Sequence, residues 1–374
     1  MSTNNNIKMF LNKNDTHHKR LTRDILDGMA DWVRVIDRNG IVIYENETMK
    51  REIGFDSLGK SCYFSLGRSC ECKKCITSTT FETEAISEKE QIINDRVFSI
   101  KSSPVKDSDG NIYAVVEVFR DITTEKNLEK QVIERNKKMG KDIKYSRALQ
   151  RKILPPKGNY GAVSIDYIYE PSEALSGDMF DIFNIDDRYT GIYISDVVGH
   201  GVSASILTMF VRQTMRAIME NTIEPSKVLK ELHKSFLDLN IDDDKYFTII
   251  YGVLDKKEKT FTYANAGHNS MPLLIRRNKI EVLENSGFPI CYLFNDINYE
   301  EKKINIEKND KLLFYTDGII ELRNKFGEEF GIERLQESIK NKKGNLIKYI
   351  LDAMNNFHYD EPQDDIALLK IRIN

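Results

Sequence analysis

Four short aspartate motifs in the C-terminal part of the chain have the residue types of a metal–phosphate site. Each lies beside a run of β-branched and aromatic residues, where glycine allows the backbone to turn and leaves the carboxylate exposed. Oxygen ligands without neighbouring cysteine favour Mg²⁺ or Mn²⁺, and two such ions can activate water and hold a phosphoryl group. The motifs therefore predict phosphomonoester hydrolysis; they are Ser176-Gly177-Asp178, Ser195-Asp196 with Gly199-His200-Gly201, Thr316-Asp317-Gly318 and Asp364-Asp365.

A single Asp-Gly pair is ordinarily only a turn. Here, however, Asp196 and Asp317 each follow an apolar run that is typical of a strand, so both carboxylates would project from a sheet edge. We therefore expect the four motifs to converge. His200 and His268 lie in small-residue turns, and we interpret them as structural rather than as general acids.

The composition indicates a soluble, multi-domain protein. A chain of 374 residues is long for one core, and a net charge of −3 disfavours a general nucleic-acid binder. No apolar run approaches the roughly 20 residues that cross a bilayer, and the polar start lacks a signal-peptide core, so we predict a cytoplasmic protein without membrane contact. Four of the five cysteines lie between Cys62 and Cys75, which fits reduced thiols or a metal site better than a disulfide framework.

The pattern divides the chain into a flexible N-terminus (1–20), a small α+β domain (21–124), a charged helix (125–156) and a larger domain (157–374). Two hairpins are predicted in the small domain, at 32–37 with 41–44 and at 97–100 with 112–119. This domain resembles PAS sensor domains at its opening and exit, through Asp37-Arg38-Asn39-Gly40, Tyr44-Glu45-Asn46 and residues 118–123.

The charged helix carries apolar residues at close to heptad spacing. Gly140 costs roughly 1 kcal/mol in its interior, and Pro155-Pro156 end it. The pattern predicts a coiled-coil homodimer, and a surface helix packed on one domain is the alternative. The apolar positions are Leu128, Val132, Met139, Ile143, Leu149 and Ile153.

The larger domain alternates strands with two amphipathic helices, which predicts packed sheets covered by helices. Helices are expected at 203–219 and 225–239. Strands are expected at 163–169, 188–194, 246–254, 259–264, 272–275, 311–315 and 366–373.

More than half of the chain resembles the PPM (protein phosphatase 2C-like) family of metal-dependent serine/threonine phosphatases, in the bacterial branch of the sporulation (SpoIIE) and stress phosphatases. The resemblance rests on the aspartate motifs and on a further ordered set of short motifs. These are Asp181, Ala204, Ala266-Gly267-His268-Asn269, Gly287-Phe288-Pro289, 318–321 and 330–335.

The resemblance implies an α-β-β-α sandwich with two Mn²⁺ or Mg²⁺ ions at one end. By motif, Asp196 would bridge both ions, Val197 would lend its carbonyl, and Asp317 and Asp364 would each bind one ion. Asp178 would hold water on the metal, and Asp365 belongs to the same metal motif. Ala148-Leu149-Gln150 with Pro155-Pro156 is similar to the junction of the stress phosphatases, whose entering helices regulate the enzyme.

The resemblance also implies a phosphoprotein substrate of the anti-anti-sigma type, in a partner-switching pathway. An inactive scaffold and a two-metal phosphoesterase for small phosphates are the alternatives. The scaffold is disfavoured because every expected carboxylate is present, and no phosphate-cradling loop supports the phosphoesterase.

The cysteine-rich loop forms a separate candidate site. Cys72 and Cys75 have chelating spacing, and four thiolates suffice for Zn²⁺ or an iron–sulfur cluster. Redox-active thiols and a plain solvated loop stay open as alternatives. The four residues are Cys62, Cys70, Cys72 and Cys75.

Overall fold

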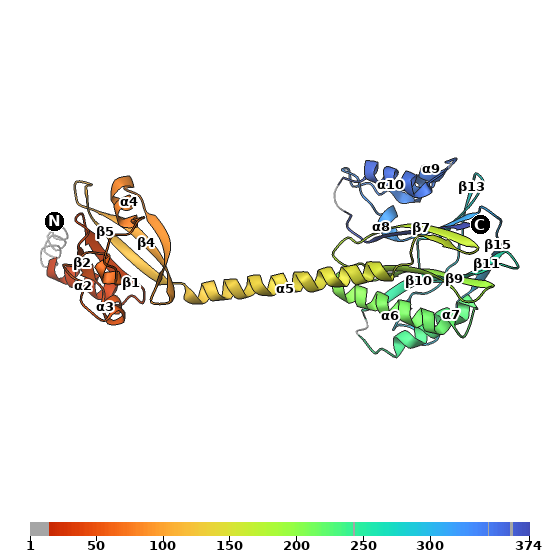
Figure 1. The fold of residues 1–374 in the computed structure, drawn as a ribbon, viewed down its shortest axis with the longest axis horizontal. Coiled ribbons are helices and arrows are strands. Elements are labelled where there is room, and N and C mark those ends of the chain that lie inside the picture. The colour runs from red at the N-terminus through yellow and green to blue at the C-terminus, as the bar shows by residue number, and fades with distance from the viewer. Residues whose placement is uncertain (1–14, 242–243, 343, 360–361) are drawn as a thin grey trace, which may run out of the picture. The chain divides into compact units, whose positions relative to one another are not determined.

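The computed structural model describes residues 15–241, 244–342, 344–359 and 362–374. The chain divides into two compact units between Lys137 and Lys138 (Figure 1). Of the predicted flexible N-terminus, residues 1–14 lie outside the described residues, and residues 15–20 begin helix α2 (Asp15–Asp27). No helix in the described ranges is long and apolar enough to cross a membrane.

The N-terminal unit is built on an antiparallel sheet with the strand order β2-β1-β5-β4-β3. Both predicted hairpins are present, and Trp32 packs against Phe98 with ring centroids 4.4 Å apart in the core. The sequence analysis did not predict α3, α4 or β3. The elements are β1 (Trp32–Asp37), β2 (Val42–Glu45), α3 (Glu47–Ile53), a 3-10 turn (Phe64–Leu66), α4 (Ile76–Thr83), β3 (Ser87–Ile93), β4 (Arg96–Lys106) and β5 (Ile112–Asp121).

Helix α5 (Thr123–Ile153) follows β5 directly and corresponds to the predicted charged helix. Its apolar seam is largely uncovered within one chain, because Leu128, Val132 and Met139 are each more than half exposed. At its C-terminal end, Ile153 packs on the core of the C-terminal unit. The N-terminal part of the seam is therefore exposed in the single chain.

The C-terminal unit contains two antiparallel sheets, ordered β15-β11-β10-β9-β8 and β13-β12-β16-β17-β7-β6, with β14 paired to β10. The predicted strands and both predicted helices are present. The strands are β6 (Gly158–Tyr160), β7 (Val163–Glu170), β8 (Asp178–Asn184), β9 (Tyr189–Val197), β10 (Tyr246–Asp255), β11 (Thr260–Ala266), β12 (Leu273–Arg276), β13 (Lys279–Val282), β14 (Ile290–Cys291), β15 (Glu301–Asn305), β16 (Lys311–Tyr315) and β17 (Ile366–Ile373). The helices are α6 (Gly201–Met219), α7 (Pro225–Leu237), α8 (Asp317–Ile320), α9 (Gly331–Ile339) and α10 (Leu346–Phe357).

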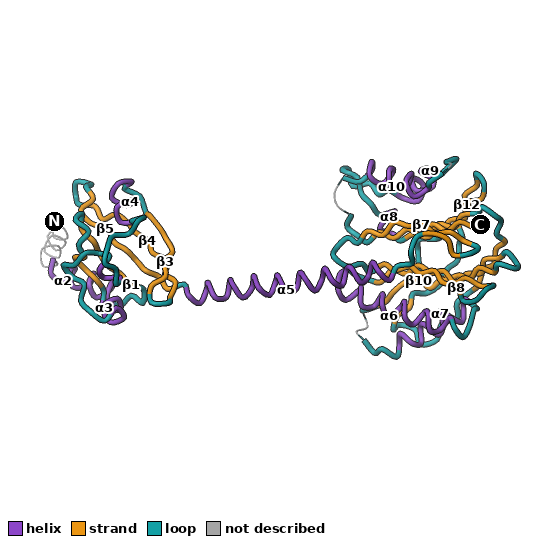
Figure 2. The backbone as a smooth tube through the Cα atoms, in the orientation of Figure 1, coloured by secondary structure: helices purple, strands orange, loops and turns teal. Residues whose placement is uncertain are grey.

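The two sheets of the C-terminal unit stack face to face with helices outside them, as the orange and purple layers of Figure 2 show. One large core joins the inner faces of the sheets to α6 and α7, and includes Phe180, Phe236 and Phe314. A second core lies between the other sheet and α8–α10, around Phe330 and Ile350. This arrangement confirms the predicted α-β-β-α sandwich.

Candidate active site

Two of the predicted site residues are direct cross-strand neighbours. Strands β8 and β9 pair so that Asp178 lies opposite Asp196, and the Val197 amide donates to the Gly177 carbonyl at 3.1 Å. Side chains in such a position are close, and like charges there repel each other. Asp178 is fully buried, whereas Asp196 is only partly covered. The sheet edge therefore presents a carboxylate pair that needs a counter-charge.

The other two predicted carboxylates come together at the end of the second sheet. Strand β16 ends at Tyr315, and the Thr316 amide donates to the Ala367 carbonyl at 3.0 Å, while the Ala367 amide donates to Thr316 Oγ1 at 2.9 Å. These bonds place Asp317, the first residue of α8, next to the Asp364 turn. Thr316 Oγ1 also donates to Asp178 Oδ2 at 2.7 Å, so one hydroxyl joins the two sheets at the site.

Asp196, Asp317 and Asp364 line one open cleft of about 670 Å³, together with Val197 and His200. Asp178 is not part of the lining, because it is buried beside Asp196 in the sheet. Among the described residues, no lysine or arginine lines this cleft. The lining that the structure describes is therefore acidic.

Burial raises the pKa values of the site aspartates, and neighbouring carboxylates add to this at Asp178, Asp196 and Asp364. Burial, followed by the charges of Asp317 and Asp364, raises the pKa of Asp196 to about 8. Burial and then the Asp196 charge raise the pKa of Asp178 well above its usual range, and burial also raises the pKa values of Asp317 and Asp364. Desolvation and like charges both disfavour the ionised form, which a bound cation would restore.

This donor set fits hard divalent cations, which take carboxylate and carbonyl oxygens as ligands. Within the described part of the chain, however, no three Asp, Glu, His or Cys side chains are placed so that they could hold a metal ion as they stand. A bound cation would offset the repulsion between the carboxylates and would have to draw their oxygens together.

Comparison with known proteins identifies the family. The family described as Stage II sporulation protein E (SpoIIE) matches residues 186–374, which include β9, β16 and the Asp364 turn. This chain belongs to the SpoIIE family. The matched segment begins after Asp178, so the first aspartate motif lies outside it.

Two Bacillus subtilis (strain 168) proteins are similar to this SpoIIE-family chain. Phosphoserine phosphatase RsbP is 30% identical over 185 residues, which are 48% of this chain and 45% of RsbP. Phosphoserine phosphatase RsbU is 28% identical over 215 residues, 56% of this chain and 63% of RsbU. The chain thus spans about half to two thirds of these relatives.

Solved structures support the fold of the SpoIIE region. The SiaA-PP2C domain of Pseudomonas aeruginosa has a TM-score of 0.57 at 18% identity, and the match covers 64% of this chain and 98% of that domain. The PP2C phosphatase domain of SpoIIE from Bacillus subtilis, with a fragment of its regulatory domain, has a TM-score of 0.50 at 15% identity. This match covers 78% of this chain and 82% of that chain.

Asp365, which the sequence places in the metal motif with Asp364, has a carboxylate that is hydrogen-bonded by the protein itself. Its Oδ1 accepts from the Ser172 amide at 2.7 Å and from the Ser172 hydroxyl at 2.9 Å, and its Oδ2 accepts from the Gly177 amide at 2.6 Å. Both oxygens of this buried carboxylate are therefore occupied by protein donors. Asp365 holds the loop before Asp178 in place, and local sequence could not distinguish it from Asp364.

His268 is structural, as the sequence analysis expected. Its Nε2 donates to the Tyr315 carbonyl at 3.0 Å, and its Nδ1 accepts from the Thr248 hydroxyl at 3.0 Å, so it joins the two sheets beside the site. Burial lowers the pKa of His268 to about 4, which keeps the ring neutral. His200 instead lies at the exposed rim, where its Nδ1 is 2.9 Å from Glu173 Oε1.

Sequence analysis identified Gln150 only as part of the junction motif, and the structure places it in direct contact with the site. Gln150 is buried at the end of α5, where its Nε2 donates to the Ser176 carbonyl at 2.8 Å and its Oε1 accepts from the Ser176 amide at 3.1 Å. The Ser176 hydroxyl in turn accepts from the Asp178 amide at 3.0 Å. The linker helix therefore holds the backbone that carries Asp178.

We expect Gln150→Ala to lower kcat about tenfold, because two hydrogen bonds worth about 0.5–1.5 kcal/mol each are lost from the Ser176 backbone. Steady-state kinetics and thermal unfolding of the full chain measure this effect. Gln131→Ala, the same change at an exposed position of α5, is the control and should change neither quantity. Equal kinetics for both variants would contradict a positioning role for Gln150.

The raised pKa of Asp196 has a consequence for stability in the absence of metal. Between about pH 4 and 8 the folded state retains a proton that the unfolded chain has released, so the free energy of unfolding should fall as pH rises through this window. We expect Asp196→Asn to remove a penalty of about 1–3 kcal/mol near pH 8. Melting temperatures in EDTA from pH 5 to 8.5 test this, and parallel curves for both proteins would contradict it.

The structure brings together three of the four cysteines in the N-terminal unit. Cys62, Cys72 and Cys75 line one cavity of about 230 Å³, whereas Cys70 is exposed. Burial raises the pKa of Cys62. Burial also acts to raise that of Cys75, but hydrogen bonds from Ser78 and Thr77 prevail and lower its pKa.

Proposed function

We propose that this SpoIIE-family chain is a metal-dependent phosphatase of phosphoserine and phosphothreonine proteins. The observation that supports this most strongly is the acidic cleft, which three aspartates from the two sheets line and to which the described residues contribute no lysine or arginine. A cleft of this composition attracts divalent cations rather than phosphate itself. Phosphate binding then depends on bound metal.

Asp196 is proposed to contact two Mn²⁺ or Mg²⁺ ions, with the Val197 carbonyl, Asp317 and Asp364 as further ligands. When bound, the two ions would supply charge stabilisation for the phosphoryl group and a more acidic water. The chain's own contribution is orientation: Thr316 fixes one oxygen of Asp178, and Asp365 fixes the loop before it. Asp178 is thus held in one rotamer beside Asp196, where we propose that it orients water.

We propose a small anti-anti-sigma-type phosphoprotein as the substrate, in a partner-switching pathway. Two relatives carry the name phosphoserine phosphatase, which supports the residue type of the substrate. The cleft is open and lacks lysine or arginine in its described lining, so little affinity can come from the phosphate alone. Contacts between the two proteins outside the cleft would supply it.

The N-terminal unit is proposed to be a PAS-like sensor, with residues 21–124 as the sensor domain, 125–156 as the signalling helix and 157–374 as the phosphatase domain. Its strand order and the continuity of β5 with α5 support this division. A change in α5 would reach the active site through Gln150 and Ser176.

We also propose a homodimer through the apolar seam of α5. Val132→Glu should raise the dimer dissociation constant at least about tenfold, because each buried aliphatic side chain contributes about 1.5–3 kcal/mol. Sedimentation equilibrium measures the effect, with Asn127→Glu at an exposed polar position as the charge-matched control. A wild-type chain that sediments as a monomer would contradict the dimer.

Phosphate release from a phosphoserine peptide by the full chain, with Mn²⁺ and then with EDTA, tests the proposed function. We expect release that depends on Mn²⁺ and discriminates against phosphotyrosine. Turnover of small phosphate esters without any turnover of phosphopeptides or phosphoproteins would instead favour a small-molecule phosphoesterase. Metal binding without turnover of either class would favour a scaffold.

A further inference from the structure

The cysteine-rich segment of the N-terminal unit forms a cavity lined by three cysteines and two carboxylates, Glu71 and Asp37, and Asp37 already accepts hydrogen bonds from the Asn39 and Ile41 amides. Cys62, Cys72, Cys75 and Glu71 line this space, which has a volume of about 230 Å³. Cys70 is exposed and does not contribute to the lining. The four clustered cysteines of the sequence therefore differ in the fold: three line the cavity and one is exposed to solvent.

A buried ion pair holds both ends of this segment. Arg34 on β1 pairs with Glu117 on β5 at 2.7 Å, and both side chains are almost fully buried. Arg34 Nη1 donates to the Cys62 carbonyl at 2.6 Å, and it also contacts the Ser65 hydroxyl. The Thr77 hydroxyl, two residues after Cys75, donates to Glu117.

This arrangement keeps Cys62 and Cys75 at one cavity although they lie at opposite ends of the cysteine-rich segment. Burying an ion pair is costly unless further hydrogen bonds satisfy it. Here the additional partners of the pair are the two flanks of the cysteine segment. The ion pair thus preorganises the segment, and a plain solvated loop would not require such an anchor.

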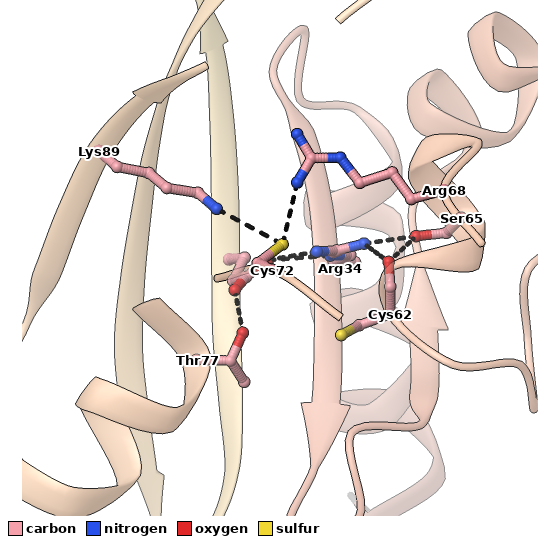
Figure 3. A network of polar contacts seen from close by, with 8 residues as sticks. Arg34, Cys62, Ser65, Arg68, Cys72, Thr77 and Lys89 are labelled. Carbon is pink, nitrogen blue, oxygen red and sulfur yellow. Dashed lines mark hydrogen bonds and ion pairs between the residues drawn. The ribbon is translucent and has the colours of Figure 1, made fainter. Parts of the chain in front are cut away.

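Positive charge surrounds the third sulfur. Arg68 Nη1 donates to Cys72 Sγ at 3.1 Å, and Lys89 Nζ lies 4.0 Å from the same sulfur. Figure 3 shows both cations reaching this sulfur. A divalent ion with three thiolates carries a charge of −1, and a carboxylate ligand makes it −2, which the two cations balance.

We propose that Cys62, Cys72 and Cys75 bind one thiophilic divalent metal ion such as Zn²⁺. Glu71 is available as a fourth ligand. As the described side chains stand, no three of the Cys, His, Asp or Glu groups lie together so that they could hold a metal ion, so the sulfurs would have to move toward one another on binding. Binding exchanges thiol protons for the metal, releases those protons to solvent, and involves no change of oxidation state. A four-thiolate iron–sulfur cluster fits less well, because Cys70 lies outside the cavity.

The metal site would also act on the linker. Glu117 lies on β5, and β5 leads directly into α5. A metal that tightens the Cys62 and Cys75 flanks would restrain the Arg34–Glu117 pair and, with it, the strand that enters the helix. This coupling rests on the proposed sensor role, whereas the metal binding itself does not.

Co²⁺ titration of the reduced full chain carrying Asp196→Asn tests the proposal. Sulfur-to-cobalt charge-transfer absorption reports thiolate ligands only, so residual Co²⁺ at the carboxylate cleft does not contribute. We expect one equivalent of thiolate-bound Co²⁺, displaced by Zn²⁺. Cys62→Ser and Cys75→Ser should each weaken binding at least about tenfold, and Cys70→Ser, the matched control, should not change it.

Three results would overturn the proposal: no charge-transfer band, a loss with Cys70→Ser equal to that with Cys62→Ser, or a protein isolated with a disulfide within this set that, once reduced, binds no metal. Circular dichroism of each variant shows whether it is folded. Phosphatase activity plays no part in the readout. A failure here therefore leaves the proposed function untouched, and the reverse also holds.

Discussion

Asp196→Asn is expected to lower metal-dependent hydrolysis of phosphoserine at least about 10³-fold, more than the loss of one electrostatic contact costs in other enzymes. Asn keeps the shape of the side chain but removes the charge that two cations would share. Asp196 also neighbours carboxylates of both sheets. It lies opposite Asp178 in its own sheet, and it lines the cleft together with Asp317, which follows a strand of the other sheet. Initial rates at saturating Mn²⁺ measure the change.

Asp187→Asn is the matched control for this variant, because Asp187 is exposed in the β8–β9 turn and does not line the cleft. It should retain the full rate. The Asp196→Asn protein should remain folded, and near pH 8 without metal it should be more stable than the wild-type protein. An Asp196→Asn protein that hydrolyses phosphoserine within a few-fold of the wild-type rate would refute the assignment of this residue.

Gly318→Ala is expected to be the second most damaging change. A Cβ at this position would lie 2.1 Å from the Asp365 carbonyl oxygen, where only glycine lets the Asp317 turn approach the Asp364–Asp365 turn. The turns would have to separate, at a cost of about 1–3 kcal/mol in stability. Because a displacement of about 1 Å can cost 10²-fold in rate, we expect activity to fall by about that factor.

Gly140→Ala is a control in which the same substitution is expected to raise stability rather than to lower it. Gly140 lies within α5, and an added Cβ there has no heavy atom within 4 Å. Alanine should therefore stabilise the helix by up to about 1 kcal/mol and leave the rate unchanged. Thermal unfolding and initial rates of both variants check the pair. Wild-type activity in Gly318→Ala would contradict the close packing of the two turns.

The parts of the site that sequence could predict are those with a local signal. Asp196 and Asp317 follow apolar runs, and glycine comes within three residues of each. The structure places Asp196 one residue before the end of β9 and Asp317 just after β16. Strand β8 was missed because Asp181 interrupts its apolar pattern. That carboxylate is fully buried and is paired with Arg216 of α6 at 2.8 Å, a contact between residues distant in sequence.

The parts that could not be predicted depend on contacts across the fold. The bond from Thr316 to Asp178 joins residues from two sheets, and the bonds from Gln150 to Ser176 join the linker to the site. Neither has a local pattern beyond an ordinary polar side chain. The same applies to the cysteine loop, where spacing alone suggested four equivalent thiols and only the fold separates Cys70 from the others.

The aspartate cleft is proposed to be a two-metal phosphatase site, and Mn²⁺ binding followed together with turnover decides whether it is. Equilibrium dialysis of the full chain and of Asp196→Asn would count bound ions while phosphate release from a phosphoserine peptide is followed in the same samples. We expect two carboxylate-bound ions per wild-type chain and turnover that follows their occupancy. In Asp196→Asn, both the ion binding and the turnover should be lost. Equal turnover in EDTA, or equal Mn²⁺ binding by the two proteins, would contradict it.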